Sequence, residues 1–273
     1  MSDYDINAYP VQKYKFVDIA YLIKRKYLYE QEVSLLYMKK ATLFLALLLS
    51  FVLSYFFPSC VTRKVAILPA YEQICSPIGK RYLSRPSQKQ VDSLVMIYGE
   101  NKELLDEYTD ILITALSYYP ELKSTHIIFE YSNEKTTMAS RPSRFLFPRT
   151  YRVLINKNKN FDGIPFDSIP WNAAVGIVGH ELAHIVDYEG LNLFGLIDRL
   201  LLYADKRYGK PYFEKSIDLI TINRGLGWQL YDWAKYAMYD NNVASEEYKE
   251  FKRRTYLNPD IIISYINHYS KYH

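Results

Sequence analysis

The chain has little cysteine: Cys60 and Cys75 are the only two in 273 residues. Zinc knuckles need several cysteines and histidines at close spacing, and neither cysteine lies near a histidine, so this kind of site is excluded. The 34 lysines and arginines exceed the 30 acidic residues by only four, a net charge of +4, and they form no stripe. Nucleic-acid binding usually needs such a basic patch, so we expect no nucleic-acid partner. The chain also lacks internal repeats and low-complexity tracts.

The overall composition is that of a globular protein. Apolar residues make up 49% of the chain and charged residues 23%, both ordinary values. The length suits one sizeable domain with appendages. Tyrosine is in excess, with 28 residues spread along the chain, and we infer no function from it.

One apolar run stands out near the N-terminus. Residues 1–40 are mixed in character, whereas residues 41–57 contain no charge and follow Lys39 and Lys40. Seventeen residues are at the lower limit for crossing a bilayer as a helix, and a buried core helix is the alternative. Five Lys or Arg residues lie in 21–40 and two in 58–77, which favours an N-terminus inside the cell. The sequence therefore predicts a transmembrane helix with the rest of the chain outside the cytoplasm.

The same run also has the layout of a secretory signal. Met38, Lys39 and Lys40 would form its basic start, and residues 1–37 would then not be translated. Cys60 would in that case be a candidate for lipidation, although residues 57–59 depart from the usual small-residue box. If Cys60 is not lipidated, it and Cys75 can form a disulfide in an oxidising compartment. Both interpretations place everything after Cys60 outside the cytoplasm, and a transmembrane helix or a lipidated Cys60 would anchor the protein to the membrane.

The remainder is predicted to be a tether, residues 58–86, followed by one α+β domain, residues 87–273. Prolines and a glycine punctuate the tether. β-Branched and aromatic residues predict strands at 125–131, 136–140 and 150–156. Apolar residues at helical spacing predict helices at 88–98, 102–117, 171–188, 191–203, 211–222, 228–239, 245–256 and 259–269. The expected fold is a small sheet, then one central helix, then a mostly helical C-terminal half.

The central helix carries the sequence HExxH at residues 180–184. Residues four apart on a helix share one face, so His180 and His184 can both bind one metal ion. Glu181 then flanks the ion as the general base for a water molecule. The flanking residues are apolar and uncharged, which suits a buried helix whose polar face is the metal face. Two core histidines or a polar surface stripe are the alternatives.

A third ligand is needed, and several acids are candidates. A third histidine in the pattern HExxHxxGxxH is absent, because Gly190 occupies its position. Glu214 and Asp218 stand four residues apart on a following helix, where one carboxylate can bind the metal and the other can hold a ligand histidine. The competing candidates are Asp187, Glu189, Glu246 and Glu247. The other histidines, His126, His268 and His273, have no ligand spacing.

With these residues the chain resembles the gluzincin metallopeptidases, the thermolysin-like group. The resemblance covers residues 170–220 and implies a zincin-like fold in which His180, His184 and Glu214 bind Zn²⁺, Glu181 is the catalytic base and Asp218 orients a histidine. The interval of thirty residues from His184 to Glu214 is longer than expected, and no motif supplies an oxyanion donor.

The predicted function is zinc-dependent hydrolysis of peptide bonds in a peptide or protein substrate, outside the cytoplasm. The alternative is a membrane-tethered binding or scaffold protein whose zinc site is structural or degenerate. A structural zinc ion is bound by four protein ligands, whereas a catalytic zinc ion has three and keeps one coordination position open. The two predicted functions therefore differ in the number of protein ligands on the zinc ion.

Overall fold

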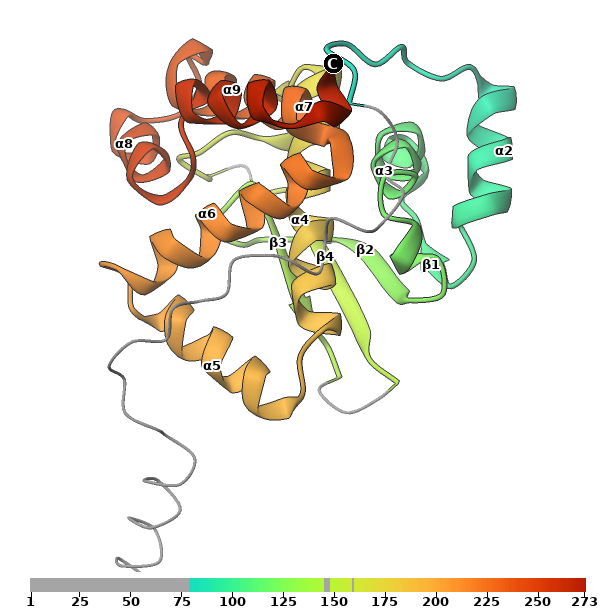
Figure 1. Ribbon diagram of the computed structural model, residues 1–273, viewed down its shortest axis with the longest axis horizontal. Helices are drawn as coiled ribbons and strands as arrows, with labels where there is room; N and C mark the ends of the chain where they lie inside the picture. Colours follow the sequence, from blue (N-terminus) through green and yellow to red (C-terminus); the bar gives the residue numbers. More distant parts are fainter. Residues whose placement is uncertain (1–78, 145–147, 159) are drawn as a thin grey trace, which may run out of the picture. The chain divides into compact units, whose positions relative to one another are not determined.

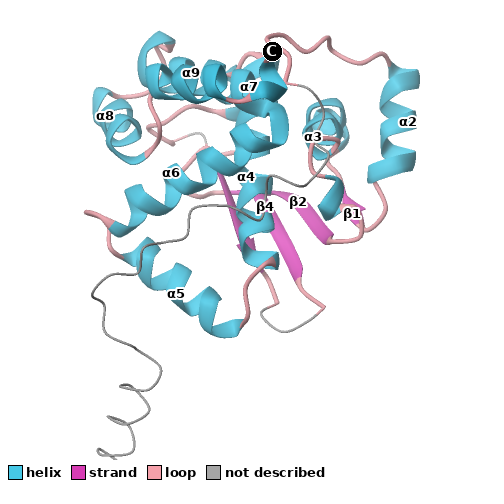
Figure 2. Cartoon of the chain, in the orientation of Figure 1, coloured by secondary structure: helices cyan, strands magenta, loops and turns pink. Residues whose placement is uncertain are grey.

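A four-stranded sheet forms one layer of the protein. The computed structural model describes residues 79–144, 148–158 and 160–273 (Figures 1 and 2). The strand order is β1-β2-β4-β3; β1, β2 and β4 run parallel, and β3 runs antiparallel to β4 at one edge. The strands are β1 (Lys102–Glu103), β2 (His126–Ser132), β3 (Met138–Pro142) and β4 (Thr150–Asn156).

Strand β4 lies between two neighbours, and its sequence reflects this position. Val153, Leu154 and Ile155 are consecutive and all buried, as expected for a strand covered on both faces. Strand β2 instead alternates, with Ile127 and Phe129 in the core. The three predicted strands therefore exist, the second displaced by two residues toward Pro142.

Helix α4 (Trp171–Glu189) runs through the middle of the protein, and all fifteen residues from Ala173 to Asp187 are buried. It begins after Pro170, ends at Gly190, and packs against α3, α6, α7 and β3. The predicted helix 171–188 agrees with α4 to within one residue. The HExxH residues thus lie on the most deeply enclosed helix of the described part of the chain (Figure 1).

The other helices surround α4, and most of them follow it in sequence, so the α+β class with a mostly helical C-terminal half is confirmed. They are α2 (Gln88–Tyr98), α3 (Thr109–Leu116), α5 (Leu193–Ala204), α6 (Gly209–Thr221), α7 (Gly227–Lys235), α8 (Glu246–Thr255) and α9 (Pro259–His268). A π-helical turn, Ile222–Leu226, separates α6 from α7. Its Gly225 has φ of 94°, a conformation that glycine adopts at little cost, and the predicted break occurs there.

The predicted helix 102–117 is wrong in its first half. Lys102 and Glu103 form β1 and pair in parallel with Ile127 and Ile128 of β2, and α3 begins only at Thr109. The apolar spacing that predicted a longer helix could not reveal this pairing, because the partner strand lies more than twenty residues further along the chain.

Residues at the end of the predicted tether contact the helical core. The Arg81 guanidinium binds both carboxylate oxygens of Asp232 on α7, at 2.8 and 3.0 Å. The Leu83 amide donates to the Asn172 side chain at the start of α4. Residues 81–83 are therefore fixed against α4 and α7.

Among the residues that the structure describes, none of the helices has the length and apolar character needed to cross a bilayer. The predicted transmembrane or signal segment, 41–57, and both cysteines lie outside the described residues.

Gly176 allows α4 to approach α7 closely, and we predict that Gly176→Ala destabilises the protein. A Cβ there would lie 2.2 Å from the Gln229 carbonyl oxygen, and backbone cannot move aside as a side chain can. The expected loss is about 1 to 3 kcal/mol, typical of overpacking, measured as a lower urea midpoint. Gly195→Ala on α5 is the control, because its Cβ meets only the Leu191 side chain; an equal loss in both variants would contradict the prediction.

Candidate metal centre

Helix α4 presents His180 and His184 to one buried site. Their side chains are only 6% and 7% exposed, and their ring centroids are 4.9 Å apart. The four-residue spacing puts both imidazoles on the same face of the helix, as the sequence predicted. Neither histidine is therefore a surface residue.

Helix α6 crosses α4 and supplies the carboxylate of Glu214. Its Oε2 atom lies 3.2 Å from His180 Nε2 and 3.3 Å from His184 Nε2. The three ligand atoms of this His180–His184–Glu214 cluster all lie within 4.8 Å of one another. Tetrahedral ligands at typical zinc distances are separated from one another by about 3.3 Å. The donor set and two of its separations therefore fit a tetrahedral metal ion.

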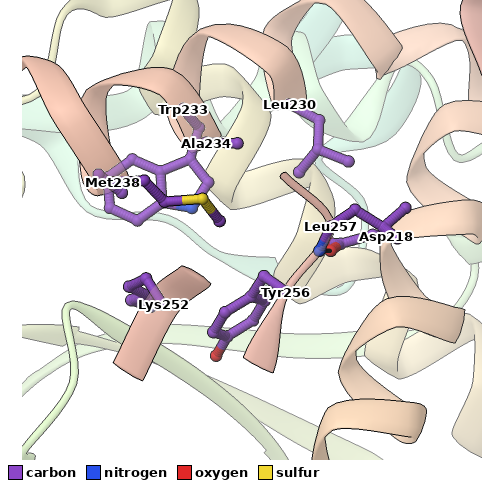
Figure 3. A pocket seen from close by; sticks show the side chains of 9 residues that line it. Asp218, Leu230, Trp233, Ala234, Met238, Lys252, Tyr256 and Leu257 are labelled. Atoms are coloured by element: carbon purple, nitrogen blue, oxygen red, sulfur yellow. Dashed lines mark hydrogen bonds between the residues drawn. The ribbon is translucent and has the colours of Figure 1, made fainter. Parts of the chain in front are cut away.

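Asp218, one turn beyond Glu214, forms a hydrogen bond with the ring nitrogen of His180 that faces away from Glu214. Its Oδ1 is 2.8 Å from His180 Nδ1, and its Oδ2 accepts a hydrogen bond of 2.8 Å from the Leu257 amide. Figure 3 shows Asp218 beside Leu257, with Tyr256 next to it. Hydrogen bonding at Nδ1 leaves Nε2 of His180 to face the cluster, which is the orientation a metal ligand needs.

His184 lacks an equivalent partner. Its Nδ1 is buried without a hydrogen bond in the described part of the chain. Aromatic rings fix it instead, with Phe213 at 5.2 Å and Tyr188 stacked at 5.9 Å between centroids. The two histidines are thus held by different means, one by a carboxylate and one by packing.

The charges of the cluster stabilise one another. Burial disfavours a charged His180, but the hydrogen bonds that its ring donates to Asp218 and Glu214 outweigh it and raise the pKa of His180 to about 10. Burial also opposes ionisation of Glu214, but its contacts with both histidines outweigh that and hold the pKa of Glu214 far below its ordinary value. His180 in the metal-free cluster is therefore protonated at neutral pH. Metal binding must displace that proton, because a histidine ligand has to be neutral.

Glu181 stands beside the cluster without joining it. The residue is 6% exposed, and its Oε2 has no hydrogen-bond partner among the described residues. Its side chain lines a cleft of about 580 Å³ that also reaches His180, His184 and Glu214. A carboxylate without a partner at the floor of a cleft is available to exchange a proton with a bound molecule.

The cleft lies between the sheet edge and helix α5, next to the His180–His184–Glu214 cluster. Residues of β3, including Ala139, Ser140 and Arg141, line one side, and Leu196 and Ile197 of α5 line another. Strand β3 pairs with β4 on one side only, because it is an edge strand of the sheet. The cleft therefore brings an edge strand and an apolar helix wall to the same site.

Tyr256 is a site residue that sequence reasoning missed. It follows α8, is half-buried, lines the cleft, and has its ring 5.5 Å from that of His180. Burial and the nearby carboxylates of Glu214 and Glu181 raise the pKa of Tyr256, so its hydroxyl remains a proton donor. One tyrosine among 28, without a motif, carries no signal in the sequence.

The competing acids contact other partners. Asp187 binds Arg199 through both carboxylate oxygens, at 2.7 and 2.9 Å. Glu246 pairs with Arg253 on the surface of α8, and its neighbour Glu247 is exposed. Neither these acids nor Glu189 joins the His180–His184–Glu214 cluster. His126, His268 and His273 also lie outside it, and all three are exposed.

We predict that Glu214→Ala removes most of the metal from the purified protein, because two imidazoles alone hold a divalent ion poorly. Asp218→Ala should weaken binding less, by about 10- to 100-fold, as is typical for residues that support a ligand. Glu247→Ala is the matched control and should bind metal like the parent. Metal content after dialysis, together with competitive chelator titration, measures all three. Full metal content in Glu214→Ala would show that another group completes the site.

No protein-family model, curated protein or solved structure matches this chain. The site is therefore described by its geometry: a buried His180–His184–Glu214 cluster that can hold a metal ion and that lines a cleft.

Proposed function

We propose that the protein is a zinc-dependent peptidase of the gluzincin type with a zincin-like fold. The observation that carries the proposal is Glu181, a buried carboxylate with no hydrogen-bond partner among the described residues, which lies beside the metal-binding cluster and lines the cleft. A site built only to bind a metal for structural reasons has no use for such a group.

The donor set favours zinc. Two imidazoles and one carboxylate are a usual ligand set for catalytic zinc, and they leave one coordination position for water or substrate. When bound, the ion supplies a Lewis acid and lowers the pKa of a water molecule. The alternative, a structural or degenerate site in a scaffold protein, needs a fourth protein ligand. In the described part of the chain only His180, His184 and Glu214 come together in this way.

Each residue around the site has one task in the proposed reaction. Glu181 accepts the proton of the attacking water and passes it to the leaving amine. The Tyr256 hydroxyl donates a hydrogen bond to the oxyanion that forms on the scissile carbonyl. Asp218 keeps His180 in the orientation that its 2.8 Å contact defines.

An extended peptide is the substrate that suits the cleft. Strand β3 lines the cleft and is an edge strand among the described strands of the sheet, and an extended chain can add to such an edge through backbone hydrogen bonds. Side chains that point to the opposite wall would meet apolar residues of α5, such as Leu196. For the setting of the reaction we propose the outside of the cytoplasm, on the sequence of residues 41–57.

We predict that Glu181→Gln keeps the metal and loses hydrolysis, by about 10²- to 10⁴-fold in kcat. The amide preserves the shape of the side chain but cannot take a proton. Metal analysis and cleavage of a quenched-peptide library measure the two properties separately. Glu189→Gln, at the end of the same helix, is the control and should change neither. Activity close to that of the parent in Glu181→Gln would refute the assigned role.

We predict that Tyr256→Phe lowers kcat by about 10²- to 10³-fold, the usual effect of removing one oxyanion donor, with KM and metal content little changed. The ring and its contact with His180 remain, and only the hydroxyl is lost. Tyr248→Phe on α8 serves as a control for the loss of a tyrosine hydroxyl nearby. An equal effect on KM and kcat/KM with unchanged kcat would assign Tyr256 to substrate binding instead.

A further inference from the structure

Helix α5 presents its apolar side chains to solvent. It has twelve residues, of which only Leu196 is buried. Five others form what we call the α5 apolar face: Leu193, Phe194, Ile197, Leu200 and Leu201, which are 42%, 56%, 43%, 66% and 51% exposed. An exposed group of this size is unusual on a soluble surface and marks a contact site.

The five residues lie together on one side of the helix. With 3.6 residues per turn they occupy an arc of roughly 120°. The inward side instead carries Leu196 and Arg199, and the Arg199 guanidinium binds Asp187 of α4. A helix of a globular protein ordinarily turns its apolar stripe toward the core. In α5 the apolar stripe lies away from the Leu196–Arg199 side and is exposed, and three of its residues line the cleft.

Cations and tyrosines gather at the C-terminal end of α5. Lys206 and Arg207 are exposed, and the Arg207 guanidinium lies over the Tyr208 ring, 5.0 Å from its centroid. Tyr203 and Tyr208 are 44% and 67% exposed. The one acid between them, Asp205, accepts hydrogen bonds from backbone amides at the start of α6. The end of α5 therefore carries two exposed cations and amphipathic aromatic rings.

The position of the face limits what can cover it. Leu193, Ile197 and Leu200 also line the cleft, but Phe194 and Leu201 do not, so a substrate in the cleft would leave part of the face exposed. A second copy of the chain packed with its α5 parallel to the first would bring two positively charged flanks together, which is unfavourable. A bilayer can cover the whole face and is also compatible with the positive charge. Apolar side chains enter the acyl boundary, tyrosines favour the interface, and cations attract anionic head groups.

We propose that the α5 apolar face, together with Lys206 and Arg207, docks on the surface of an anionic membrane. Helix α5 lies in the interface and does not cross the bilayer. The docking is separate from the proposed hydrolysis and from the apolar run at 41–57. Because three residues of the face also line the cleft, the membrane surface would lie beside the cleft.

Lipid-depth quenching in the full chain tests this docking. Phe194→Trp and Leu201→Trp place a fluorophore on the face, and Met96→Trp places one on α2, where Met96 is 85% exposed. Figure 1 shows α2 and α5 on different sides of the described domain. Each variant is mixed with vesicles of phosphatidylcholine and phosphatidylglycerol whose acyl chains carry bromine. An unchanged urea midpoint confirms that each variant is folded.

The expected result is loss of the added emission in Phe194→Trp and Leu201→Trp, with Met96→Trp unaffected. Adding Lys206→Glu and Arg207→Glu to Phe194→Trp should reduce the quenching to that seen in vesicles without phosphatidylglycerol. Quenching at none of the three positions, or at all three equally, would overturn the proposal. A concentration-dependent blue shift without quenching would assign the face to a second copy and also overturn it. If Phe194→Trp is quenched equally with and without Lys206→Glu and Arg207→Glu, the role assigned to anionic lipid is wrong.

Discussion

The buried carboxylate of Asp218 is held from two distant parts of the chain. One oxygen contacts His180 on α4 and the other accepts the amide of Leu257, after α8. A buried carboxylate costs several kcal/mol unless its charge is compensated, and hydrogen bonds to charged groups return about 1.5 to 3 kcal/mol each. The mutual placement of α4, α6 and the segment after α8 therefore depends on this one side chain. The same contact that orients a candidate ligand also fixes the backbone next to Tyr256.

Helix α4 can carry a polar site in the core because most other residues along its buried part are apolar or small. Gly176 lets α7 approach, and at Gly179 the backbone carbonyl accepts a hydrogen bond from the Tyr119 hydroxyl. His180, Glu181 and His184 share the remaining face. Burial on all other sides leaves these three little freedom to move, and a preorganised site of this kind needs little rearrangement before it binds a metal or a substrate.

Sequence spacing predicts those parts of the site that are local to a helix. The i, i+4 relation of His180 and His184, and that of Glu214 and Asp218, follow from helix geometry alone, and the structure brings all four residues together. Tyr256 and the cleft depend on how α8, α5 and β3 meet, and no local pattern encodes that. The same limit explains β1: Lys102 and Glu103 pair with a strand far along the chain, so helical spacing misassigned them. The order of the strands in the sheet could likewise not be predicted from local sequence patterns.

The role of Asp187 could not be decided from the sequence, and the structure shows it in an ion pair with Arg199. At i+3 from His184 it was a candidate ligand, yet its carboxylate points to α5 and binds Arg199 with two hydrogen bonds. That ion pair is largely enclosed, with the Arg199 and Asp187 side chains 25% and 10% exposed, so solvent screens it less than a surface pair. It fixes Arg199 on the inward side of α5. Because the apolar residues of α5 lie on the other side of the helix, the same pair directs Phe194 and Leu201 outward. An acid on the metal-binding helix thus determines which surface the neighbouring helix presents.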